Sequence, residues 1–479
     1  MASKTKVNQD NLETLGARQL AELLMDLAGS NAAVKRRLRL ELTVTAAPKS
    51  LVSEVGKRLG QIGRARTFVD RRSCRGIAAD LETLRRTIVD KAAKSEPTEA
   101  LELMWRFLDL AESVQARCDD SDGVVGDVFC MACRDLGPLA RAAQPDPIAL
   151  ANRMFAAINE NRYGQYDDLI EVLAPVVGEK GLDILKAQFI EFSRAPVEKP
   201  TGDKRRIVGW GMSGPMYEDE LEARHRRTIV HRALQEIAEA QGDVDAFIAQ
   251  YDEQAVRRPG IAADIARQLL RVGRATEALQ AIEAAEHGRD GRVDFDWENA
   301  RIATLEALGR GDEAQAARWS CFERAFSSEH LRAYLERLPD FEDVEAEERA
   351  LTHVERSKNV LQALEFLVSW PALDRAARLI TQRAGELDGD VYEVLSPAAD
   401  ALAAKYPLAA TMALRAMIDF TLAKARSGRY RHAARHFMEC ASLASSITER
   451  GDAFETHGAY ALRLKAEHGR KSGFWNLIS

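Results

Sequence analysis

Apolar residues recur every three or four positions along most of this chain, which is the spacing of an amphipathic helix. In the first helix expected, Leu20, Leu24 and Leu27 share one face. The same period predicts helices over 77–94 and 98–117. Runs of alternating apolar and polar residues, typical of strands, are scarce. The pattern therefore predicts an all-α fold.

A repeated motif lies in the second half of the chain. The pattern Gly-Arg-x-x-Glu-Ala begins at Gly273 and again at Gly309, and a looser copy begins at Gly428. The first two copies are 36 residues apart (273 to 309), a period typical of helix–turn–helix units in repeat arrays. We expect each glycine to end one helix in the left-handed conformation and each alanine to let the next helix approach closely.

These patterns predict three regions. Residues 1–195 are expected to form an N-terminal helical bundle. Residues 196–217 contain three prolines and four glycines with no helical period, and we expect an irregular loop there. Residues 218–479 are expected to form a right-handed α-solenoid of tetratricopeptide-like helix pairs. Such arrays present extended surfaces to other macromolecules.

Composition narrows the class of protein further. Hydrophobic residues make up 46% of the chain and charged residues 29%, as in a globular protein. The net charge of −7 gives no global preference for a polyanionic partner. Six cysteines in so long a chain do not suggest a disulfide framework, and neither a secretory signal nor a membrane span is expected. We therefore expect a cytoplasmic protein.

Two segments carry a resemblance to known families. The first is Leu-Met-Trp-Arg-Phe-Leu-Asp-Leu at 103–110, followed by Asp-Asp-Ser-Asp-Gly at 119–123; the second is the tail at 457–475. Together they resemble an uncharacterised family of bacterial all-helical proteins, which implies no established activity. The tail also resembles the helical C-terminal regions of some SWIM zinc-finger proteins. Because the Cys and His ligands of that finger are absent, the resemblance implies no zinc site here.

The predicted loop is the best candidate for contact with a partner chain. It would expose Trp210 and Met212 beside Arg205 and Arg206, and aromatic residues and arginine are enriched where proteins bind one another. Its glycines also fit the G-x-G-x-x-G spacing of dinucleotide sites. No βαβ unit surrounds them, so we favour the partner surface over a nucleotide site.

Other motifs favour structural roles over chemistry. The Asp-Asp-Ser-Asp-Gly turn fails as an EF-hand calcium loop, because Cys118 and Phe129 would occupy ligand positions, and helix capping explains it better. Cys130 and Cys133 form a lone C-x-x-C in a helical pattern and are expected in the core. Signatures of hydrolases, zinc peptidases and P-loop enzymes are missing. We therefore predict no catalytic, cofactor or metal residues, and a non-enzymatic scaffold for protein–protein interaction. An enzyme whose site is assembled from residues far apart in sequence stays open as a third alternative.

A basic stretch supports an alternative function. Between Ser30 and Arg75 the chain carries twelve Lys or Arg and three acids. Clustered basic residues are the footprint of nucleic-acid binding, and the residues concerned would contact the phosphate backbone. Those expected to contribute most are Lys35, Arg36, Arg37, Arg71 and Arg72.

This alternative predicts a salt-dependent affinity. Binding to duplex DNA or RNA should weaken steeply as salt rises, because each neutralised phosphate releases counterions. Replacing Arg36, Arg37, Arg71 and Arg72 by Gln should reduce the slope of log affinity against log salt by about 0.7–0.9 for each phosphate that is no longer neutralised. Titrations by fluorescence anisotropy at several salt concentrations measure the slope. A flat response would exclude nucleic acid as the partner.

Overall fold

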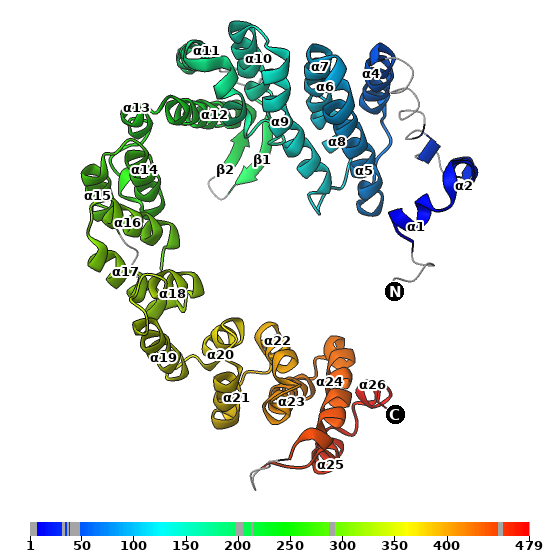
Figure 1. Cartoon of the computed structure of the whole chain (residues 1–479), viewed down its shortest axis with the longest axis vertical. Coiled ribbons are helices and arrows are strands. Elements are labelled where there is room, and N and C mark those ends of the chain that lie inside the picture. The colour runs from blue at the N-terminus through cyan, green and yellow to red at the C-terminus, as the bar shows by residue number, and fades with distance from the viewer. Residues whose placement is uncertain are drawn as a thin grey trace. The chain divides into compact units, whose positions relative to one another are not determined.

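The computed structural model confirms that the chain is all-α apart from one small hairpin (Figure 1). It describes residues 7–30, 34–35, 38, 48–196, 205–211, 214–286, 293–448 and 454–478. The chain packs as two compact units, Met1–Glu253 and Gln254–Ser479. The loop predicted to separate two domains, 196–217, falls inside the first unit. The predicted domain boundary at this loop stays a prediction.

The described part of the first unit consists of helices and one hairpin, and the π-helical turn η1 directly continues α5. Its elements are α1 (Gln9–Glu13), α2 (Gly16–Ser30), α4 (Pro48–Arg64), α5 (Arg71–Thr87), η1 (Ile88–Ala92), α6 (Ala93–Ser95), α7 (Pro97–Leu108), α8 (Ala111–Gln115), α9 (Val124–Ala143), α10 (Pro147–Asn159), α11 (Leu169–Arg194), β1 (Ile207–Gly211), β2 (Gly214–Tyr217), α12 (Glu218–Gln241) and α13 (Val244–Ile248).

Helix α7 lies at the centre of the first unit's core. It packs on α9 and α4, and its Trp105 and Phe107 are buried, as their apolar neighbours in the sequence predict. The Phe107 ring lies 5.4 Å from the ring of Phe129 on α9. Burial of large aromatic side chains supplies much of the free energy that holds such helices together.

Of the predictions for the Asp-rich turn and the C-x-x-C motif, the structure confirms one and only part of the other. Asp120 accepts hydrogen bonds from the backbone N–H groups of Val125 and Gly126 at the start of α9, which confirms helix capping. Cys133 is buried as predicted, but the prediction for Cys130 is wrong because its side chain lies on the exposed side of α9. Among the described residues, no helix combines the length and apolarity needed to cross a bilayer.

The segment predicted as an irregular loop contains an antiparallel hairpin instead (Figure 1). In its register Ile207 pairs with Tyr217 and Trp210 pairs with Pro215, and Gly214 takes a φ of +119° at the turn. Short apolar stretches flanking a glycine turn favour a hairpin, and the three prolines and four glycines obscured that signal.

The second unit is a succession of helices that pack on their neighbours along the chain (Figure 1): α14 contacts α15 and α16, and α20 contacts α21 and α22. Its main helices are α14 (Pro259–Arg271), α15 (Ala275–Glu283), α16 (Phe295–Ala307), α17 (Gly311–Ala325), α18 (Ser328–Leu335), α19 (Glu342–Glu355), α20 (Val360–Ser369), α21 (Leu373–Gln382), α22 (Tyr392–Leu402), α23 (Pro407–Ala423), α24 (Tyr430–Leu443), α25 (His457–His468) and α26 (Ser472–Trp475).

The repeat motif behaves as predicted in its first two copies. Gly273 and Gly309 have φ values of +76° and +71°, the left-handed conformation that glycine adopts without a Cβ clash. Ala278 and Ala314 are fully buried where α15 and α17 approach their neighbours. The looser third copy differs, because Gly428 lies in a short 3₁₀ turn and not in the left-handed region.

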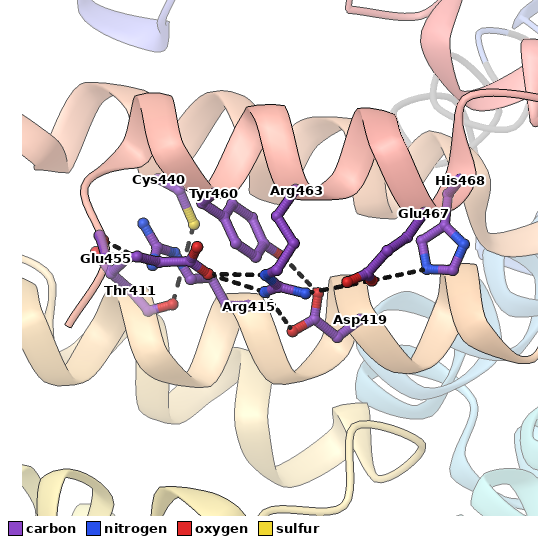
Figure 2. A network of polar contacts seen from close by, with 9 residues as sticks. All are labelled: Thr411, Arg415, Asp419, Cys440, Glu455, Tyr460, Arg463, Glu467 and His468. Carbon is purple, nitrogen blue, oxygen red and sulfur yellow. Dashed lines mark hydrogen bonds and ion pairs between the residues drawn. The ribbon is translucent and has the colours of Figure 1, made fainter. Parts of the chain in front are cut away.

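A polar cluster on α23 and α25 attaches the end of the second unit (Figure 2). The hydroxyl of the fully buried Tyr460 donates to Asp419 at 2.9 Å. Arg463 donates to Glu455 at 2.9 Å and to Asp419 at 3.4 Å. Burial raises the pKa of Tyr460 far above its usual value, and the hydrogen bond to Glu455 raises the pKa of Arg463. Both side chains therefore keep their protons at any physiological pH.

Arg415 is the deepest cation of this cluster, with 7% of its surface exposed. Its guanidinium lies between the rings of Phe454, at 4.4 Å, and Tyr460, at 4.2 Å, and donates to the backbone oxygen of Glu455 at 3.1 Å. Burial lowers its pKa, since a low-dielectric surrounding disfavours charge. The two aromatic faces compensate part of that cost.

Replacing Tyr460 by Phe tests how strongly this cluster stabilises the second unit. The change removes the donor to Asp419 and keeps the ring, so the free energy of unfolding should fall by about 1 kcal/mol. The melting temperature of the second unit should fall by about 2–4 °C, measured by calorimetry. Tyr392→Phe is the matched control, because Tyr392 is 46% exposed. Equal melting temperatures for the two variants would contradict a stabilising role.

Candidate functional site

Only some of the residues predicted to contact a partner are exposed and unengaged on the hairpin. Trp210 is 75% exposed, as expected for a contact residue. Arg205 is already engaged: it donates to Asp219 at 2.9 Å, and its guanidinium lies 3.8 Å from the centre of the Tyr217 ring. Arg206 forms a longer ion pair with Glu218 at 3.5 Å. Met212 lies outside the described residues.

The helix that follows the hairpin glycines is unsuited to bind a phosphate at its N-terminus. Helix α12 follows β2 directly, and its first turn carries Glu218, Asp219 and Glu220. Carboxylates at a helix N-terminus occupy the end of the dipole that would otherwise attract an anion. A nucleotide would meet carboxylates there, and these already pair with Arg205 and Arg206.

The basic residues predicted to contact nucleic acid are also partly paired. Lys35 and Arg72 are exposed, whereas Arg71 donates through Nε to Asp122 at 3.1 Å. That hydrogen bond lowers the pKa of Asp122, so the carboxylate stays ionised and opposes the arginine's charge. Arg36 and Arg37 lie outside the described residues. A nucleic-acid surface formed by these residues stays a prediction.

A groove that the sequence did not reveal lies in the second unit. It has a volume of about 1120 Å³ and is bounded by α17, by α18 with the turn after it, and by α19. One face of α17 lines it through residues spaced three or four positions apart: Asp312, Gln315, Ala316, Trp319 and Glu323. The facing side of α19 has the same spacing: Glu345, Glu348, Arg349, Thr352 and His353, with Arg356 directly after the helix. This period places the side chains of each helix in one row.

Aromatic rings fix the floor of the groove. The Trp319 ring lies 5.2 Å from the ring of Tyr334 on α18, and the guanidinium of Arg349 lies 4.3 Å from the centre of the Trp319 ring. Arg349 also donates to the Tyr334 hydroxyl at 3.3 Å, and Gln315 donates to the Tyr334 backbone oxygen at 3.0 Å. These contacts hold the floor in one arrangement before any partner arrives, which lowers the entropic cost of binding.

The charges of the groove are nearly balanced. Four carboxylates line it, from Asp312, Glu323, Glu345 and Glu348, with three guanidiniums, from Arg337, Arg349 and Arg356. Glu348 already pairs with Arg375, and Arg337 with Glu306. A nucleic-acid backbone needs a positive surface, so this groove suits a protein segment of mixed character better.

An exposed aromatic residue stands beside the groove. Phe341, at the N-terminal end of α19, is 84% exposed and has a φ of +76°. Val344, one turn further on, is 63% exposed. A bulky residue in the left-handed region costs free energy, and such strain is concentrated at functional positions. Both residues follow Leu338 and Pro339, which line the groove itself.

Comparison with known proteins places the whole chain in one family. The model for the "Family of unknown function (DUF6880)" matches residues 2–477. The chain belongs to this family. For this DUF6880 protein the match supports the resemblance to an uncharacterised family, while the SWIM-like tail and a bacterial source stay predictions. The tail residues Tyr460, Leu464 and Phe474 are buried in the second unit's core.

Further comparisons add little for the DUF6880 chain. No curated protein matches it. A solved structure described as a "Circular tandem repeat protein with novel repeat topology and enhanced subunit contact surfaces" is 14% identical, with 97% of this chain and 94% of that chain covered and a TM-score of 0.13. A score so low carries no argument about fold or function.

The strain at Phe341 gives a direct test. Phe341→Gly and Phe341→Ala both remove the exposed ring, but only glycine relieves the left-handed backbone. We expect the glycine variant to unfold with a free energy about 1 kcal/mol higher than the alanine variant. Urea denaturation of both variants measures this difference. Equal stabilities would show that the backbone at Phe341 is unstrained and that the ring is held outward at no cost.

Proposed function

We propose that this protein is a non-enzymatic helical-repeat scaffold that holds a segment of another protein in the groove between α17 and α19. The observation that carries the proposal is the groove's preorganised aromatic floor. Trp319, Tyr334 and Arg349 are the residue types that dominate binding energies at protein interfaces. They are already locked against one another by ring contacts and hydrogen bonds.

The dimensions of the groove support a macromolecular partner. Small-molecule pockets enclose about 300–1,000 Å³ and bury most of their ligand. The present groove exceeds that range and runs along one face of each of two helices. A helix or an extended segment laid between α17 and α19 would contact both rows of side chains, with Phe341 and Val344 available at one end.

The surface predicted on the loop, which the structure forms as a hairpin, is a second contact region in the same proposal. Trp210, Ile207 and Val208 are exposed apolar residues of β1. Arg205 is occupied by acidic residues of α12, so we assign the hairpin's contribution to its apolar side chains. The expectation that the protein acts in the cytoplasm belongs to this proposal as well.

Blocking the groove tests the proposal. Ala316 is an exposed groove residue on α17, so Ala316→Arg fills the space and leaves the existing contacts in place. We expect it to reduce recovery of the protein's partner from cell extract by about tenfold or more, which corresponds to roughly 1.4 kcal/mol or more of binding free energy. Quantitative mass spectrometry of the tagged full chain measures the recovery.

Three comparisons make the result decisive. Ala303→Arg places the same change on an exposed position of α16 outside the groove and should leave recovery unchanged. Trp210→Ala separates the hairpin from the groove. Nuclease treatment of the extract separates protein from nucleic acid: loss of all partners after nuclease would move the function to the basic N-terminal residues. Full recovery with Ala316→Arg would exclude the groove as the contact surface.

A further inference from the structure

A small cavity lies in the first unit, apart from the groove of the second. It has a volume of about 260 Å³ and is enclosed by the end of α10, the loop 161–168, the start of α11 and one face of α12. Its walls include three isoleucines, Ile158, Ile170 and Ile229. Three charged side chains, Asp167, Arg232 and Glu236, also line it. The cavity thus combines an apolar wall with a small set of charges, the usual composition of a ligand site.

The loop that carries Asp167 is held in place by its own hydrogen bonds. The side chain of Asn161 accepts from the Tyr166 N–H at 3.1 Å and donates to Asp167 at 2.7 Å. Gly164 takes a φ of +77° at the turn, and its backbone oxygen accepts from the Asp167 N–H at 3.2 Å. The Asp167 carboxylate is therefore positioned before any ligand binds.

The charges in the cavity favour a cation over an anion. Arg232 lies between the two carboxylates: its Nε donates to Glu236 at 2.7 Å and its Nη1 lies 3.1 Å from Asp167 Oδ1. Its Nη2 donates to the Asp167 backbone oxygen at 3.1 Å. Each guanidinium nitrogen thus already has an acceptor, and two negative charges surround one positive charge. An incoming anion would meet this excess of negative charge and would be repelled.

The two carboxylates share one guanidinium. Asp167 Oδ1 accepts from Asn161 at 2.7 Å and lies 3.1 Å from Arg232 Nη1, and Glu236 Oε1 accepts from Arg232 Nε at 2.7 Å. Glu236 is the less exposed of the two, and burial raises its pKa, since one shared arginine compensates only part of its desolvation. A second cation would stabilise the ionised form.

We propose that this cavity binds a primary ammonium group carried on a short alkyl chain, with the ammonium beside the carboxylates that Arg232 only partly neutralises and the alkyl chain against the three isoleucines. An ammonium has three donors that can turn toward acceptors on separate elements, whereas a planar guanidinium needs a paired acceptor. The volume lies below the range of about 300–1,000 Å³ usual for larger ligands, which favours a ligand of this small size. The group comes either from a free alkylamine or from a lysine side chain.

Three probes on the full chain test this proposal by ligand-observed NMR titration. n-Pentylamine represents the free amine, Nα-acetyl-lysine N-methylamide represents the lysine side chain, and pentan-1-ol has the same alkyl length without the charge. We expect at least one ammonium probe to bind about tenfold or more tightly than pentan-1-ol, because hydrogen bonds to ionised groups are the stronger ones. Binding of the blocked lysine identifies a protein side chain as the source, and binding of pentylamine alone identifies a small amine.

A matched pair of variants assigns the site. Glu236→Gln keeps the shape and one oxygen acceptor for Arg232, and should weaken the ammonium probe by about tenfold. Glu222→Gln makes the same change at an exposed position of α12 outside the cavity and should leave binding unchanged. Circular dichroism confirms that both variants remain helical. Binding of pentan-1-ol as tight as the amines, absence of amine binding, or equal affinities for the two variants would overturn the proposal.

Discussion

Each helix of the second unit can bury its apolar face only against its neighbours along the chain. Alanine occupies the contact points, as at Ala278 and Ala314. Because its side chain is only a methyl group, the neighbouring helices can approach closely. Stability in such an arrangement is close to a sum of local interfaces. The polar cluster of Arg415, Tyr460 and Asp419 follows from the same constraint, because α25 is fastened to α23 by directed bonds as well as by apolar contacts.

The same constraint produces the groove. Helices that pack through one row of small side chains leave another row uncovered, and α17 and α19 turn these rows toward each other. Aromatic and guanidinium groups then stack to form a floor that neither helix could hold alone. The groove therefore depends on the sequence in which α17, α18 and α19 pack on one another. The cavity of the first unit depends instead on one hydrogen-bonded loop and on one face of α12.

Local signals predicted the fold but not the sites. Helix periodicity, the glycines at 273 and 309 and the buried Trp105 depend on residues close in sequence, and the structure confirms them. The hairpin was missed because glycine and proline suggest a loop. Arg71 and Asp122, like Trp319 and Arg349, meet only after folding, so no local pattern could show that a charge is neutralised or a ring covered.

The hairpin also bears on self-association. A two-stranded sheet offers free backbone edges, and apolar side chains such as those of Ile207 and Trp210 would favour pairing between copies. Pro215 leaves β2 without one backbone donor, so this strand cannot complete a regular ladder with another chain. Pro215 thus makes the β2 edge of the hairpin a poor template for a further strand, while Trp210 stays exposed on β1.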